Sequence, residues 1–216
     1  MDGRRFDAET RTRAQAARLV GVDEAGRGPL AGPVVVAAVV LPPEPSPALG
    51  EARDSKTMTP RSRERLFGVV ASEALAVSVA WAHPRAIDRD NILRATLLAM
   101  GRAARRAAAK SGASPLLVLV DGPRRVPELG LDQEAVVDGD AKSLAIAAAS
   151  VVAKVVRDRW MVRLERRRPG YGFSKHKGYG TKAHLEALDR LGPCDAHRRT
   201  YAPVARAADA ARAARA

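Results

Sequence analysis

The sequence has little cysteine and relatively little negative charge. Its single cysteine, Cys194, excludes a disulfide within the chain and a zinc site built only from cysteines. Such cysteine usage fits a reducing compartment, so we expect a cytoplasmic protein. Asp and Glu number 24 against 37 Lys and Arg, which gives a formal net charge of +13. A surface this basic favours a polyanionic partner, although charge alone does not define the fold.

Long apolar runs are also missing. The longest, 34–41, is too short to cross a lipid bilayer and is bounded by Pro33 and Pro42. Residues 1–18 are charged and lack the apolar segment of a secretory signal. We therefore expect neither a leader peptide nor a membrane anchor.

The chain does contain enough apolar sequence for one core. It has 216 residues, of which 46% are hydrophobic, and this composition excludes wholesale disorder. A chain of this size buries about 70% of its unfolded surface, so folding requires neither a disulfide nor a metal.

Strand-like and helical segments alternate along the sequence. The Val-rich run 34–41 is typical of a buried strand. Further strands are predicted to begin at 19–22 and to span 74–83, 116–120 and 135–137. Helices are predicted over 60–73, 92–111, 144–167 and 182–191, and Ser143 is expected to cap the third of these.

This order predicts a mixed α/β domain. We divide the chain into a polar lead-in at 1–18, a core at 19–160, a C-terminal helical subdomain at 161–204 and a flexible tail at 205–216.

Four carboxylates lie where predicted strands end or are interrupted: Asp23, Glu24, Asp121 and Asp140. Buried carboxylates are costly unless they are paired or coordinated, and a cluster of them repels itself unless a cation neutralises it. Oxygen ligands select Mg²⁺ or Mn²⁺ over zinc. These residues are therefore candidate ligands of a hard divalent cation.

Other interpretations stay open for each acid. Asp121 precedes a glycine in a common turn dipeptide, and Asp140 is placed to begin a helix. Asp138 competes with Asp140 for the fourth acidic position. His176 and His197 are further candidate ligands, but no His/Cys cluster supports a zinc site.

The residues at 21–34, GVDEAGRGPLAGPV, resemble the first signature of type 2 ribonuclease H, the ribonuclease HII family. Further segments match that family in the same order, and the resemblance is to its bacterial type. They are 54–56, 120–122, 139–143, 147–158, 171–173, 176–181 and 197–199.

The resemblance implies a ribonuclease H-like fold, a mixed five-stranded sheet flanked by helices, with a C-terminal helical extension. It implies an endonuclease that hydrolyses the RNA strand of RNA–DNA hybrids and incises duplex DNA 5′ of a single ribonucleotide, leaving a 3′-hydroxyl and a 5′-phosphate. Such an enzyme serves replication and ribonucleotide excision repair, and we expect a monomer. The catalytic and metal-binding set, with two Mg²⁺ or Mn²⁺ ions, becomes Asp23, Glu24, Asp121 and Asp140.

The substrate-binding residues follow from the same matches. The turn Gly26-Arg27-Gly28 lets backbone groups approach a sugar closely, although alone it reads as an ordinary loop. The resemblance implies that Tyr179 contacts the ribose-to-deoxyribose junction of the substrate. Without the resemblance, Tyr179 is interpreted as a partly buried anchor of its loop. Ser143 joins the substrate-binding set. Basic residues in or beside the matched segments are expected to contact phosphates: Lys56, Lys142, Lys175, Lys177, Arg198 and Arg199.

Two other functions compete with this one. A non-catalytic nucleic-acid-binding protein on the same fold would bind phosphate against four unneutralised acids, which argues against it. A Holliday-junction resolvase would share the two-metal chemistry, but the turn at 26–28 and Tyr179 favour the ribonuclease.

Overall fold

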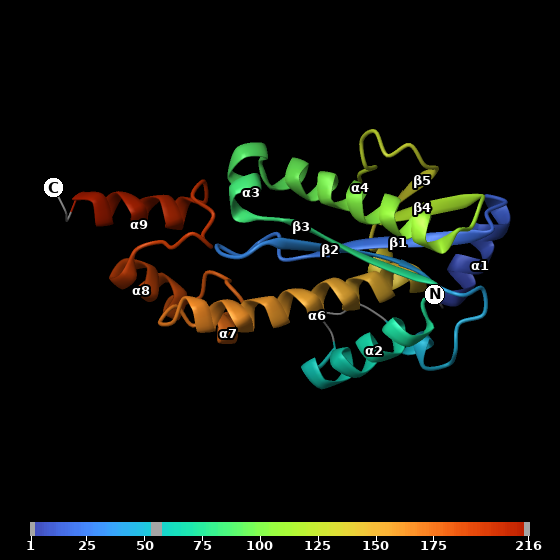
Figure 1. The fold of residues 1–216 in the computed structure, drawn as a ribbon, viewed down its shortest axis with the longest axis horizontal. Coiled ribbons are helices and arrows are strands. Elements are labelled where there is room, and N and C mark those ends of the chain that lie inside the picture. Colours follow the sequence, from blue (N-terminus) through green and yellow to red (C-terminus); the bar gives the residue numbers. More distant parts are fainter. Residues whose placement is uncertain (1–2, 53–57, 214–216) are drawn as a thin grey trace. The chain divides into compact units, whose positions relative to one another are not determined.

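The computed structural model, which describes residues 3–52 and 58–213, contains a five-stranded sheet (Figure 1). Its strand order is β3-β2-β1-β4-β5. β1 is antiparallel to β2 and parallel to β4, and β4 is parallel to β5. The predicted mixed α/β architecture is therefore confirmed. The strands are β1 Arg18–Ala25, β2 Val34–Val40, β3 Ala76–Ala82, β4 Leu116–Asp121 and β5 Gln133–Val136.

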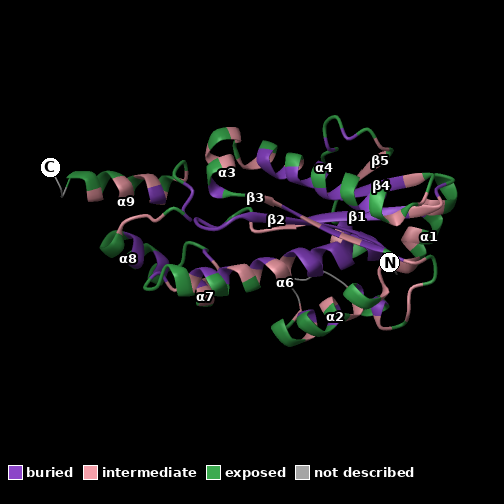
Figure 2. Cartoon of the chain, viewed as in Figure 1, coloured by how far each residue is buried: buried purple, intermediate pink, exposed green. Residues whose placement is uncertain are grey.

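The residue pattern of each strand matches its place in the sheet. β2 is buried along its whole length, as its continuous apolar sequence predicts (Figure 2). β3 lies at the sheet edge and alternates between buried and half-buried residues. In β4, residues 117–120 are buried and the strand ends at the half-buried Asp121. The apolar interior of the sheet thus ends at a carboxylate.

The helices at 60–73, 92–111, 144–167 and 182–191 have the predicted limits, whereas the helices at 84–90, 139–142, 173–176 and 202–213 were not predicted. Among the helices of the described residues, none is both long and apolar enough to cross a membrane. The helices are α1 Gly3–Arg13, α2 Pro60–Glu73, α3 Pro84–Asp90, α4 Ile92–Ser111, α5 Gly139–Lys142, α6 Leu144–Arg167, α7 Phe173–His176, α8 Lys182–Leu191 and α9 Ala202–Ala213, with a 3-10 turn at Leu49–Glu51.

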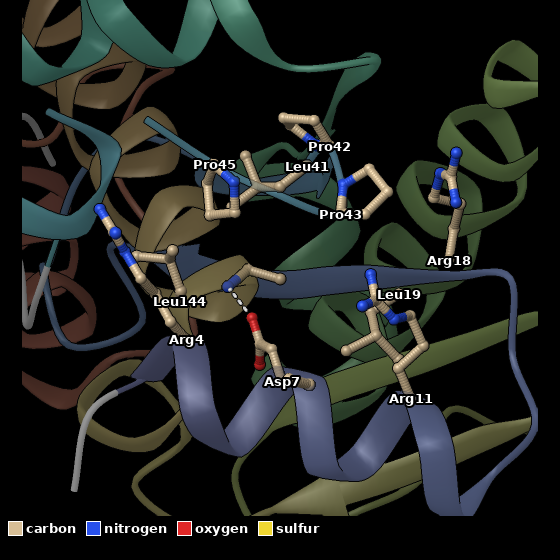
Figure 3. A pocket seen from close by; sticks show the side chains of 12 residues that line it. Arg4, Asp7, Arg11, Arg18, Leu19, Leu41, Pro42, Pro43, Pro45 and Leu144 are labelled. Atoms are coloured by element: carbon tan, nitrogen blue, oxygen red, sulfur yellow. Dashed lines mark hydrogen bonds between the residues drawn. The ribbon is translucent and has the colours of Figure 1, made fainter. Parts of the chain in front are cut away.

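The lead-in forms helix α1, and Asp7 anchors it to the start of α6. One carboxylate oxygen of Asp7 accepts the backbone N–H of Ala145 at 2.9 Å (Figure 3). Burial raises the pKa of Asp7 to about 6. Ser143 is buried, and its hydroxyl accepts the N–H of Ile146 at 3.2 Å, which confirms it as the cap of α6.

The chain forms two compact units whose limits differ from our division. Unit 1 comprises residues 1–25, 35–80 and 96–155, and unit 2 comprises 26–34, 81–95 and 156–216. Two stretches from the first half of the sequence therefore belong with the C-terminal part. Our division into consecutive segments missed these two stretches, because contacts between residues far apart in the chain leave no pattern in the local sequence.

Unit 2 has its own apolar core, to which the C-terminal residues contribute. Val204 and Ala207 of α9 are buried against Leu30 and Leu188. The prediction of a flexible tail at 205–216 is therefore wrong for the part that the structure describes, which is helical as far as Ala213. The small side chains of this Ala-rich segment still bury one helix face.

Candidate active site

Neighbouring parallel strands bring three of the predicted acids together in unit 1. Val22 of β1 lies opposite Val120 of β4, so the next residues, Asp23 and Asp121, are adjacent across the two strands. Glu24 follows Asp23 on β1. A carboxylate oxygen from each of these three acids lies within 4.8 Å of the other two. The convergence follows from strand register.

Asp23 is the most buried acid of the group, with 4% of the residue exposed. Burial, followed by the nearby charges of Glu24 and Asp121, raises the pKa of Asp23 well above its ordinary value. The Ser150 hydroxyl and the Glu24 N–H, the latter at 2.6 Å, donate to this carboxylate and offset the effect in part.

Asp121 is held by the backbone of the segment that carries Asp140. Its Oδ1 accepts the N–H of Gly139 at 2.8 Å. Gly139 begins α5, and Asp140 is the second residue of that helix. In the part of the chain that the structure describes, the acids that meet within 4.8 Å do not include Asp140. Its place in the metal-binding set stays a prediction.

The donor set fits a hard divalent cation. All three ligands are carboxylate oxygens, which Mg²⁺ and Mn²⁺ prefer to the nitrogen and sulfur ligands of zinc. Burial and, after it, repulsion from Glu24 and Asp121 raise the pKa of Asp23, and a bound cation would relieve that repulsion. No second His, Cys, Asp or Glu group within residues 3–52 and 58–213 meets the same distance limit.

In unit 2, the buried Arg198 holds the turn at 26–28 from inside. Arg198 is 0% exposed. Its guanidinium donates to the carbonyl oxygens of Gly26 at 2.5 Å, Arg27 at 2.6 Å and Gly32 at 2.9 Å. Burial lowers the pKa of Arg198. The prediction that Arg198 contacts a phosphate is therefore wrong, because its donors are occupied by backbone and shielded from solvent.

A second buried arginine, Arg157, packs behind the same turn. It donates to the carbonyl oxygens of Pro33 at 3.0 Å, Ala31 at 3.2 Å and Lys177 at 3.0 Å. Burial lowers its pKa to about 10. A Cβ at Gly26, which has φ +95°, would lie 1.9 Å from the Arg157 Nε, so this position requires glycine.

Sequence reasoning missed Arg157, although a signal was present. On α6, Arg157 lies four residues after Ala153 and four before Met161, and all three residues are buried. An arginine on a buried helical stripe needs several internal acceptors, so it indicates a structural role.

Tyr179 lies beside the turn in unit 2. A Cβ placed on Gly28 would be 3.8 Å from the Tyr179 Cε1, so the aromatic ring covers this glycine. The Tyr179 residue is 47% exposed. The Leu30 N–H donates to the carbonyl of Gly178 at 2.8 Å and ties the two loops together. The structure thus brings Tyr179 and the turn together, as two parts of one surface.

The remaining basic candidates differ in their surroundings. Lys142 and Lys175 are exposed, and the Lys142 ammonium donates to the carbonyl of Val137 at 2.6 Å. Lys177 is half-buried, has φ 52° and donates to the carbonyl of Ser174. Lys56 lies outside the described residues.

Ser143 does not fit the substrate-binding role that we expected. It is 1% exposed and its hydroxyl caps α6, so its side chain presents nothing to a bound strand. That prediction is wrong because a helix-capping serine and a phosphate-binding serine look alike in sequence.

Comparison with known proteins by family model and by sequence identity indicates the same family. The family model described as Ribonuclease HII matches residues 20–204. Ribonuclease HII of Acidovorax sp. (strain JS42) is 52% identical over 192 residues, which make up 89% of this chain and 88% of that protein.

Solved structures agree with this match. Ribonuclease H2 from Pyrococcus horikoshii OT3 has a TM-score of 0.68 and 25% identity, covering 90% of this chain and 99% of that one. Bst-RNase HIII in complex with Mn²⁺ has a TM-score of 0.75 at 20% identity, covering 91% of this chain and 71% of that one, which is a likeness of fold.

Proposed function

Because this chain belongs to the ribonuclease HII family, whose members are metal-dependent ribonucleases acting on RNA–DNA hybrids, we propose that it also incises duplex DNA 5′ of a single ribonucleotide. The observation that carries the proposal is the meeting of Asp23, Glu24 and Asp121 within 4.8 Å. A merely basic binding protein gains nothing from three acids that repel each other and the phosphates of its ligand.

The acids would hold two divalent ions, Mg²⁺ or Mn²⁺. Such ions, when bound, activate water and neutralise charge on the leaving oxygen. Asp23, Glu24 and Asp121 would hold these ions, with Asp23 as the most buried ligand, and we propose Asp140 as a further one. The Ser150 hydroxyl and the Gly139 N–H orient the carboxylates of Asp23 and Asp121.

Selectivity for RNA would come from the surface in unit 2. The carbonyls of Gly26, Arg27 and Gly32 are taken by Arg198, which fixes the turn before a substrate binds. Backbone groups of a fixed glycine turn can reach a 2′-hydroxyl, the group that separates RNA from DNA. The ring of Tyr179 would pack on the sugar next to the cut and read the junction between ribose and deoxyribose.

Phosphate contacts would come from cationic side chains. Lys142 and Lys177 remain candidates on the described surface, together with Arg199 and with Lys56. The net charge of +13 supplies the long-range attraction. We propose that a monomer binds one duplex and leaves a 3′-hydroxyl and a 5′-phosphate.

The test is a labelled duplex with one ribonucleotide, incubated with the protein with and without Mg²⁺ or Mn²⁺. We expect one nick, immediately 5′ of the ribonucleotide and only with metal. An all-DNA duplex of the same sequence is the control for the substrate. Asp121→Asn is the control for the protein, because Asn keeps the acceptor for Gly139 but loses the charge; it should cut slower by orders of magnitude. Cleavage of an RNA–DNA hybrid but not of the single-ribonucleotide duplex would reject the proposal that the protein incises at a single ribonucleotide.

A further inference from the structure

Three of the four histidines of this chain lie together in unit 2. The ring centroids of His176 and His184 are 4.4 Å apart, and those of His184 and His197 are 5.3 Å apart. His184 is 0% exposed and His197 is 2% exposed. Burial lowers the pKa of both, that of His197 to about 3, so both rings are neutral near pH 7.

Hydrogen bonds fix which ring nitrogen carries each proton. The Nδ1 of His197 accepts the backbone N–H of Cys194 at 3.0 Å, so the ring proton of His197 is on Nε2. That Nε2 donates to the Nε2 of His184 at 3.1 Å. The ring proton of His184 is therefore on Nδ1, which donates to the carbonyl oxygen of Tyr179 at 2.9 Å. Three successive hydrogen bonds, each with its donor and acceptor defined, therefore connect Cys194 through His197 and His184 to Tyr179.

The backbone of Tyr179 is held at both of its polar groups. Its N–H donates to the carbonyl of His176 at 3.0 Å, and its carbonyl accepts the N–H of Thr181 at 2.8 Å besides the His184 ring. The side chain itself rests on Gly28, which offers no side chain to fix it. The direction of the exposed ring depends on the backbone that carries it.

Packing alone does not account for the histidine pair. Two apolar side chains would fill the same space without removing two imidazoles from water. The pair supplies what apolar side chains cannot, a donor aimed at one backbone carbonyl. His197 in turn holds the tautomer of His184 that makes this donor available.

We propose that His184 is a positioning residue for Tyr179, with His197 fixing its tautomer, so that the preference for a lone ribonucleotide depends on this buried pair. The inference rests on the proposed role of Tyr179 at the sugar next to the cut. His184 acts through the backbone of Tyr179 and does not touch substrate.

The test compares two replacements of His184. In His184→Asn, the side-chain amide replaces Nδ1 as the donor to Tyr179, whereas His184→Leu removes the donor and keeps the volume. The readout is kcat/KM on the single-ribonucleotide duplex divided by kcat/KM on a continuous RNA–DNA hybrid. We expect His184→Leu to lower this ratio about tenfold, the scale of one buried hydrogen bond, and His184→Asn to hold it within about twofold.

Stability is separated from positioning by Leu164→Ala. Leu164 is buried in the core of unit 2 on α6, so its truncation should lower the melting temperature and leave the ratio unchanged. An equal fall of the ratio in all three variants would overturn the proposal and leave the pair a purely structural role. An unchanged ratio in His184→Leu would also overturn it.

Tyr179→Ala, measured in parallel, separates this inference from the proposed function. If Tyr179→Ala lowers the ratio and His184→Leu does not, the positioning role fails and the role of Tyr179 stands. If Tyr179→Ala leaves the ratio unchanged, the role of Tyr179 fails and the inference falls with it. Nicking of the single-ribonucleotide duplex by the unchanged chain remains the separate test of the function.

Discussion

The N–H of Gly139 donates to the Oδ1 of Asp121 at 2.8 Å, which links the end of β4 to the start of α5. A Cβ at position 139 would lie 3.0 Å from that same oxygen and 2.6 Å from the Cδ1 of Ile146. The carboxylate and the helix cannot both keep their places beside a larger residue.

Gly139→Ala should therefore displace the Asp121 carboxylate and lower kcat by about tenfold or more, because small shifts of a reacting group are costly. Steady-state cleavage of an RNA–DNA hybrid at saturating metal measures the effect. Gly68→Ala is the matched control, since Gly68 is exposed within α2 and has open space where a Cβ would lie. It should raise the free energy of unfolding by about 0.5–1 kcal/mol and leave kcat unchanged. Wild-type kcat in Gly139→Ala would show that this contact does not matter.

Asp23→Asn should stabilise the metal-free protein and abolish stabilisation by Mn²⁺. The pKa of Asp23 is raised, so its ionised form destabilises the fold increasingly as pH rises above the ordinary carboxyl value. Asn keeps an oxygen acceptor without the charge, and we expect a gain of about 1 kcal/mol in metal-free free energy of unfolding at pH 7. Thermal unfolding with and without Mn²⁺ measures both effects.

The control for that experiment is Asp209→Asn, an exposed acid on α9 that should change neither quantity. An Asp23→Asn protein that Mn²⁺ still stabilises as strongly as the wild type would place the ion elsewhere.

Acid should destabilise the protein through the buried histidines. The pKa of His197 is lowered from 6.5 to about 3, so between these values the unfolded chain binds a proton that the folded chain excludes. The free energy of unfolding must then fall as pH falls through this window. His197→Asn, which keeps an acceptor for the Cys194 N–H but does not titrate, should lose about 2 kcal/mol less than the wild type between pH 7 and pH 5.

Urea unfolding at the two pH values provides the comparison. The difference between the proteins is the informative quantity, because the raised pKa values of Asp7 and Asp23 act in the opposite direction in both. Identical losses in the two proteins would mean that His197 does not exclude a proton.

The neighbours Arg198 and Arg199 should behave differently when truncated. Arg198→Ala removes the guanidinium that donates to the carbonyls of Gly26 and Gly32, whereas the Arg27 carbonyl keeps the Tyr201 hydroxyl as a donor. We expect Arg198→Ala to lower the free energy of unfolding by about 3 kcal/mol. Arg199 is exposed, and Arg199→Ala should keep the stability but reduce the salt dependence of duplex binding by about one phosphate contact. Equal stabilities for the two variants would contradict the structural role of Arg198.

The strands and the main acids were predictable because their signals are local. The Val-rich run of β2 marks a strand that is buried on both faces, and apolar residues lead directly into Asp23 and Asp121. What local patterns could not give was the partner of each polar side chain. Arg198 was interpreted as a phosphate contact, and only the fold shows that it holds a turn; Ser143 was predicted both to cap a helix and to bind substrate, and only the first role fits the structure.

The composition of unit 2 was beyond sequence reasoning for the same reason. Residues 26–34 and 81–95 lie far from 156–216 in the chain. The first stretch joins unit 2 through backbone carbonyls that accept from Arg157 and Arg198, and the second joins through Asp88, whose carboxylate accepts the N–H groups of Arg199 and Thr200. The pair His184 and His197 is an example of contacts that sequence patterns could not predict. His184 and His197 fall in or near matched segments, but their shared hydrogen bond and its link to Tyr179 depend on three-dimensional packing.

The most direct test of the central claim is an anomalous difference map from a crystal of this protein soaked in Mn²⁺. The account predicts strong peaks coordinated by carboxylate oxygens of Asp23, Glu24 and Asp121, with Asp140 as a further ligand. Mn²⁺ bound elsewhere, with no peak among these three acids, would contradict it.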